Sequence, residues 1–213
     1  MRITMFTVAV LIGATMPSAM AADIQTATGA VTLESATDHV EPTLSASGEI
    51  PGRDISTFRV SSDGTQLTLT ATMTEPASGT GADAVVRMYI DTDDAAATGA
   101  AASFSDVSGF EFQIDLNLCV KYDNGAVACA GTGGTKAASY FATAVVKNTA
   151  SGEDVKGVWD LPETPVKGAV VAAPVAYGDL GVKPGQTVRF YAREGDGPFD
   201  ASSYFPQVRL TLK

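Results

Sequence analysis

Three carboxylates lie within four residues of the chain, at Asp91, Asp93 and Asp94. A hard cation such as Ca²⁺ takes several oxygen ligands from carboxylates, backbone carbonyls and waters, and a loop with acids at positions i, i+2 and i+3 can supply two or three of them. The segment lacks the glycine and glutamate spacing of an EF-hand loop. The cluster therefore predicts a cation site, with calcium as the favoured ion; a solvated acidic loop without an ion is the alternative.

The charge of the surrounding sequence favours a cation further. Between residues 61 and 120, nine acids accompany a single basic residue, Arg87. Acids so close together repel one another, and a bound cation would relieve that repulsion. The whole chain carries a formal net charge of -10, which disfavours nucleic acid and anionic membrane surfaces as partners. We expect cations, glycans or other small ligands instead, and the oligomeric state stays open.

The segment that leads into the acidic loop has the pattern of a β-strand. Val86, Met88 and Ile90 fall on one face, and Arg87 and Tyr89 fall on the other. A long insertion rich in small residues follows, and a connection of that length without regular structure is usually functional or mobile. We expect a central strand that carries the acidic loop at the rim of a sheet.

The same composition or alternation recurs along the chain. Runs of β-favouring or alternating apolar and polar residues lie at 28–33, 55–60, 66–73, 110–117, 140–147, 155–159, 166–175, 187–193 and 208–212. No segment has the pattern of a long helix. About ten short strands at this spacing predict an all-β fold, a two-sheet antiparallel β-sandwich. Pro174 lacks a backbone donor, so its strand is expected at an edge.

The N-terminus has the features of a secretory signal peptide. Arg2 precedes a mostly apolar run over residues 5–15, and an A-x-A motif follows. The run is shorter than the roughly 20 residues of a transmembrane helix, although a retained N-terminal anchor is the alternative. We predict a signal peptide over residues 1–21 and a secreted or periplasmic single domain over residues 22–213, without membrane insertion. Residues 22–53 are weakly patterned and suit an irregular N-terminal extension.

Cys119 and Cys129 flank a hairpin sequence. Residues 123–125, Asp-Asn-Gly, suit a three-residue loop with the glycine in the left-handed conformation. Counting outward from this loop places the cysteines at a non-hydrogen-bonded pair, where side chains approach closely. In an exported protein this geometry predicts a disulfide, which should contribute roughly 2.5–3 kcal/mol. A two-thiol metal site is the alternative, but the only histidine, His39, is distant in sequence.

Other residues suggest further ligands. Trp159 and Tyr177, with neighbouring aromatic residues, could stack against sugar rings. Aromatic side chains of this kind are more often buried in the core. Met73 and Met88 could ligate haem, but both fall on apolar strand faces. His39 has no accompanying G-x-S-x-G motif of a serine hydrolase. Carboxylate pairs for glycoside cleavage are plentiful, but none stands out.

Several segments together resemble one family. Residues 54–72 resemble the opening hairpin of extracytoplasmic DOMON-like and family 9 carbohydrate-binding-module-like sandwiches. Residues 89–99 resemble their "IDTDxxxxTG" strand and loop, and residues 109–114 resemble the following "GxDYxI" strand, although Phe110-Glu111-Phe112 departs from its usual acid. Residues 177–191 resemble a late "LG…G…I-x-F" segment. The resemblance spans roughly residues 54–213.

This resemblance implies a jelly-roll-like sandwich that binds a ligand rather than catalysing a reaction, with sugars, haem or calcium as the associated ligands. The family's aromatic sugar clamp and haem ligands have no placement on this chain. We therefore predict a non-catalytic binding protein, not an enzyme, with a calcium-stabilised acidic loop. The alternatives are a carbohydrate-binding module, a cell-surface or matrix structural protein, a haem-binding domain and a carboxylate-dependent hydrolase.

Overall fold

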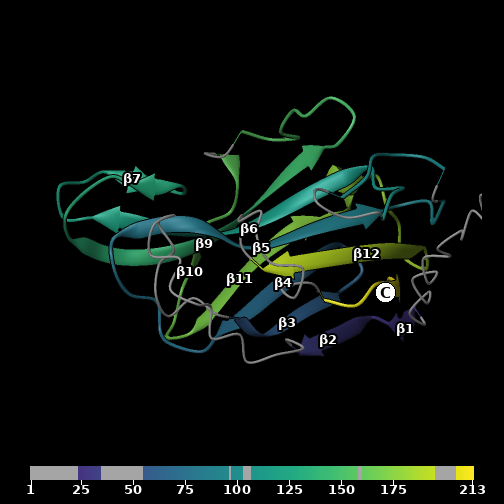
Figure 1. The fold of residues 1–213 in the computed structure, drawn as a ribbon, viewed down its shortest axis with the longest axis horizontal. Helices are drawn as coiled ribbons and strands as arrows, with labels where there is room; N and C mark the ends of the chain where they lie inside the picture. Colours follow the sequence, from purple (N-terminus) through teal and green to yellow (C-terminus); the bar gives the residue numbers. More distant parts are fainter. Residues whose placement is uncertain (1–23, 35–54, 96, 103–106, 158–159, 195–204) are drawn as a thin grey trace, which may run out of the picture.

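The computed structural model describes residues 24–34, 55–95, 97–102, 107–157, 160–194 and 205–213. In these ranges thirteen strands and one short helix form two main sheets (Figure 1). The prediction of an all-β sandwich is confirmed, with more strands than the ten expected. The predicted signal peptide, residues 1–21, lies outside the described residues.

The larger sheet has β5 at its centre, as predicted for the strand that enters the acidic loop. Its order is β1 (Gln25–Thr28), β13 (Val208–Thr211), β12 (Thr187–Glu194), β5 (Gly81–Asp91), β6 (Phe112–Tyr122), β9 (Ala137–Asn148) and β10 (Thr164–Pro165). Two short strands extend it: β7 (Val127–Ala128) pairs with β6, and β8 (Gly131–Thr132) pairs with β5. The acidic loop therefore leaves the middle of the sheet rather than an edge.

The smaller sheet has four strands, all paired antiparallel. Its order is β11 (Val170–Ala176), β4 (Gln66–Met73), β3 (Ile55–Ser62) and β2 (Ala30–Glu34). The strand with Pro174 lies at the edge, as predicted. The short helix α1 (Tyr177–Leu180) follows it and ends at Gly181.

Two predicted elements differ from the structure. The single strand expected over residues 28–33 is two strands, because Gly29 takes a left-handed φ of 73° between them and the chain passes from one sheet to the other. β1 then pairs parallel with β13, so the sandwich is not wholly antiparallel. The strand expected over residues 155–159 is absent from its described part, residues 155–157. The nearest β-pairing among the described residues is an isolated bridge between Lys147 and Asp154, which precedes that segment.

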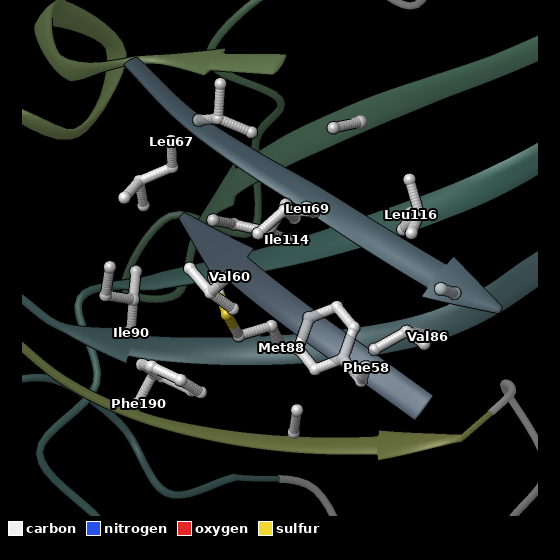
Figure 2. Close-up of a cluster of buried hydrophobic side chains, with 14 of the residues drawn as sticks. Phe58, Val60, Leu67, Leu69, Val86, Met88, Ile90, Ile114, Leu116 and Phe190 are labelled. Carbon is white, nitrogen blue, oxygen red and sulfur yellow. The ribbon is translucent and has the colours of Figure 1, made fainter. Parts of the chain in front are cut away.

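The core lies between the two sheets and is built from the apolar half of each alternating strand (Figure 2). Of the side chains labelled in Figure 2, those of the smaller sheet come from β3 and β4, and those of the larger sheet come from β5, β6 and β12; β2, β9, β11 and β13 add further buried residues to the same core. The central ones are Phe58, Val60, Leu67, Leu69, Val86, Met88, Ile90, Ile114, Leu116 and Phe190, all buried. Each such side chain contributes about 1.5–3 kcal/mol through its burial. Because these residues face inward, the alternate residues of β5 and β6 face outward.

The outer face of the larger sheet is polar yet largely buried. Asp115, Arg189 and Arg193 point to this side and are all buried. The insertion after β5 folds back over it, and Phe110 packs with its ring centroid 5.8 Å from that of Tyr89 and 6.4 Å from that of Tyr191. A small second cluster of apolar residues thus anchors the insertion onto the outer face.

The cysteine hairpin forms as predicted. Cys119 and Cys129 are joined by a disulfide, and Lys121 pairs with Val127 in the expected register. Gly125 occupies the loop with a left-handed φ of 82°. In the part of the chain that the structure describes, no helix has the length and apolar character needed to cross a membrane.

Candidate cation site

The candidate site begins at Asp91, the last residue of β5, whose side chain is 0% exposed. Arg189 lies directly opposite it on β12 and donates to Oδ2 of Asp91 from Nε at 3.0 Å and from Nη2 at 2.7 Å. The other oxygen, Oδ1, accepts the backbone N–H groups of Asp93 and Ala95 at 3.1 and 3.2 Å. Asp91 therefore joins the sheet to the start of the loop.

Asp93 is exposed and closes the loop on itself. Its carboxylate accepts the backbone N–H of Ala95 at 3.0 Å and the hydroxyl of Thr98 at 3.0 and 3.2 Å. Desolvation raises the pKa of Asp93, but the hydrogen bonds from Thr98 and Ala95 outweigh it, so the pKa lies below its usual value of 3.8. The carboxylate is therefore held in its charged form.

Glu111 supplies the third carboxylate of the site. It lies just before β6, and its Oε2 accepts the backbone N–H and the hydroxyl of Thr92 at 2.7 and 3.2 Å. One oxygen each from Asp91, Asp93 and Glu111 lie within 4.8 Å of one another. Two of the three predicted aspartates thus come together with a glutamate that the sequence analysis did not select as a ligand.

Antiparallel pairing explains the position of Glu111. Ile90 at the end of β5 pairs with Phe112 at the start of β6. The residues that follow the first strand and precede the second must therefore meet at one rim of the sheet. The sequence did contain a sign that Glu111 belongs to the site, because it is an acid at the start of the next segment with clear strand alternation.

Asp94 is not in this group, contrary to the prediction. Its carboxylate accepts from Nε of Arg209 at 3.0 and 2.8 Å, and this hydrogen-bonded contact raises the pKa of Arg209. The residue also has a φ of 53°, in the left-handed region that few non-glycine residues adopt. Asp94 thus faces Arg209 of β13, and its carboxylate also lies 3.8 Å from Nε of Arg189, the partner of Asp91.

The hydroxyl of Thr98 lies in the centre of an oxygen-rich group. It is 3.0 Å from Oδ1 of Asp93, 3.0 Å from Oε1 of Glu111 and 2.8 Å from the carbonyl oxygen of Ala95. A hydroxyl has one proton and two lone pairs, so it cannot satisfy all these acceptors together. At least one of these acceptors is therefore left without the hydroxyl proton, in a group of oxygens of the kind that hard cations prefer.

Two arginines partly neutralise the acidic loop, and both come from distant strands. The sequence around the cluster contains Arg87 alone, but pairing with β12 and β13 brings Arg189 and Arg209 against it. Four carboxylates and two guanidinium groups leave a formal charge of -2 (-4 + 2). Within the described residues, Asp93 and Glu111 have no basic partner. The remaining charge equals that of one divalent cation with opposite sign.

The structure does not support an aromatic platform at Tyr177. This side chain is 5% exposed, lies in the core, and donates its hydroxyl to the backbone oxygen of Lys213 at 3.4 Å. A ring that stacks on a sugar must present a face to solvent, and the buried ring of Tyr177 does not. Trp159 and His39 lie outside the described residues. Met73 and Met88 are core residues.

Comparison with protein-family models, with curated proteins and with solved structures found no match to this chain. The fold and the site by themselves define an all-β sandwich with an oxygen-rich acidic loop at the rim of its larger sheet.

Proposed function

We propose that the protein is an exported, non-catalytic binding protein whose acidic loop holds a calcium ion. The observation that carries the proposal is the convergence of Asp91, Asp93 and Glu111 within 4.8 Å around the hydroxyl of Thr98. The predicted signal peptide and the disulfide support export, because disulfides persist in oxidising compartments.

The donor set favours calcium over other cations. All the candidate ligands are oxygens, which select hard ions rather than the zinc, copper or iron that thiolate and imidazole ligands prefer. Calcium accepts six to eight oxygen ligands in flexible geometry, whereas magnesium requires a nearly octahedral site and keeps several waters. Carboxylates, a hydroxyl and a backbone carbonyl from an irregular loop suit the more tolerant ion.

The ion would act by fastening three points of the chain together. Asp91 belongs to β5, Asp93 and Thr98 belong to the insertion, and Glu111 leads into β6. The same insertion covers the outer face of the larger sheet through Phe110. Calcium would therefore hold this cover in place, which gives the ion a structural and ligand-organising role.

Thermal unfolding with and without calcium tests the proposal. At free calcium 100-fold above its dissociation constant, linkage predicts about 2.7 kcal/mol of stabilisation, which corresponds to a rise in Tm of about 5–11 °C for a chain of this size. Circular dichroism in CaCl₂, MgCl₂ and EDTA measures the effect, and magnesium should produce a smaller one.

A pair of glutamate variants assigns the effect to the site. Glu111→Gln should abolish most of the calcium-dependent rise. Glu75→Gln removes the same charge from an exposed residue after β4 and should leave the rise intact. An unchanged Tm of the unmodified protein in calcium and in EDTA would show that the loop holds no such ion.

A further inference from the structure

The cysteine hairpin, residues 119–129, has an asparagine followed by a glycine at its tip, Asn124 and Gly125. It lies at one end of the larger sheet, where β7 returns beside β6 (Figure 1). Both residues are exposed. Glycine lets its backbone approach other groups closely, because it has no side chain. An asparagine before an exposed glycine is therefore open to attack on its side-chain amide by the next backbone nitrogen.

Water is the only reactant that this chemistry needs besides the chain. The backbone nitrogen of Gly125 loses its proton and bonds to Cγ of Asn124, and the side-chain nitrogen leaves as ammonia. Water then opens the resulting succinimide ring at either carbonyl, which gives aspartate or isoaspartate. In isoaspartate the main chain runs through the side-chain carbons, so the backbone of the turn becomes longer by a carbon atom.

The closed turn engages both reacting groups. The backbone N–H of Gly125 donates to the carbonyl oxygen of Tyr122 at 2.9 Å. Oδ1 of Asn124 accepts the backbone N–H of Ala126 at 3.0 Å. Both hydrogen bonds must break before the nitrogen reaches Cγ, and breaking them costs free energy. Deamidation therefore requires the turn to open.

Two restraints keep the turn closed. The disulfide joins Cys119 to Cys129, 10 positions apart in the chain, and so limits how far the two arms of the hairpin separate. Tyr122 lies at the base of the turn, is 3% exposed and donates its hydroxyl to the carbonyl oxygen of Thr80 at 2.5 Å. This bond fixes the turn to the segment that leads into β5.

We propose that Asn124 is a deamidation site and that opening of the cysteine hairpin sets the rate of the reaction. A thiol reductant supplies two electrons and two protons to the disulfide, leaves as its own disulfide, and frees the hairpin to open. Isoaspartate lengthens the loop, so the turn that closes between Gly125 and Tyr122 does not form again. The modification thus leaves a permanent mark on molecules that have lost the disulfide.

Peptide mass mapping of the full chain, after incubation in mildly alkaline buffer with and without dithiothreitol, tests the proposal. All samples are then fully reduced, alkylated and digested with trypsin. The asparagines of the chain are Asn117, Asn124 and Asn148. Trypsin places them in separate peptides, residues 88–121, 122–136 and 148–156.

We expect Asn124 to convert at least about tenfold faster in dithiothreitol, because a disulfide across so short a loop changes the opening equilibrium by that factor or more. Asn148 is the internal control, since the branched side chain of Thr149 shields the following nitrogen, and it should stay unconverted in both buffers. Equal rates at Asn124 in the two buffers, or no conversion there in either, would overturn the proposal.

Two variants test the turn with the disulfide intact, so that a general loosening of the fold by reduction does not decide the result. Tyr122→Phe removes the bond to Thr80 and should raise the rate at Asn124 several-fold. Tyr140→Phe is the matched control, because Tyr140 donates to the carbonyl oxygen of Gly79 at 2.7 Å but lies on β9, outside the hairpin. Equal rates in the two variants would overturn the control by the hairpin. These residues lie outside the candidate cation site, so the calcium-dependent rise in Tm tests that site separately.

Discussion

Asp91 and Arg189 form the ion pair on which the local arrangement of the site depends. Both side chains are buried, and the guanidinium also donates to the backbone oxygen of Ser108 at 2.7 Å. The arginine thus joins the end of β5 to the far end of the insertion. Burying two charges is costly, and only close pairing with further hydrogen bonds offsets the cost.

Removing Arg189 should therefore be strongly destabilising. Arg189→Met leaves the carboxylate of Asp91 buried without a counter-charge, and the free energy of unfolding should fall by about 3–5 kcal/mol. Urea denaturation measures it. Arg59→Met, at an exposed arginine of β3, provides the control and should change stability by less than about 0.5 kcal/mol. Equal effects of the two substitutions would contradict a special role for the buried pair.

Asp93 makes the loop sensitive to acid. Its pKa is depressed in the folded protein, so its hydrogen bonds stabilise the fold fully above the unfolded pKa, and this contribution is lost as the pH falls through the lower folded pKa. In EDTA, the difference in Tm between the parent and Asp93→Asn should be present at pH 6 and should shrink below about pH 4. A difference that grows on acidification would contradict the hydrogen-bonding pattern.

At the scale of elements, the two described ends of the insertion after β5 pair with each other beside the sheet. Ala100 and Phe110 pair as an isolated bridge. Gly99 allows the backbone of Phe110 to lie this close. Gly99 has a φ of 67°, and a Cβ atom there would overlap the backbone of Phe110. The glycine is thus required twice, for its conformation and for the close contact.

Gly99→Ala should therefore disrupt the pairing of Ala100 with Phe110 that holds the insertion in place. The left-handed backbone alone costs about 1–3 kcal/mol for a residue with a side chain, and the overlap adds to it. Gly152→Ala is a matched control, because Gly152 has a φ of 72° but open space around its Cβ position. Hydrogen exchange should show loss of protection at Ala100 and Phe110 in Gly99→Ala alone. Retained protection there would show that the contact is dispensable.

At the scale of the whole molecule, the two faces of the larger sheet have different roles. The inner face of β5 and β6 forms the core, and the outer face carries buried charges and an aromatic cluster. The candidate cation site lies at the rim where β5 ends and β6 begins.

The sequence by itself determined the local features. Alternation identified β3, β4, β5, β6 and β12, because the inward half of each strand must be apolar. The disulfide followed from the hairpin register around Gly125, and the edge position of β11 followed from Pro174. Each of these depends on residues close together in the chain, so the local pattern was enough.

Only the tertiary structure decided which side chains meet at the site. Glu111 joins Asp91 and Asp93 because β6 pairs with β5, and Asp94 leaves them because Arg209 lies on β13. Tyr177, which composition alone could not distinguish from a surface ring, turns into the core. These outcomes depend on contacts between residues up to 115 positions apart in the chain. The period-two pattern within one strand carries no information about which strand lies beside it.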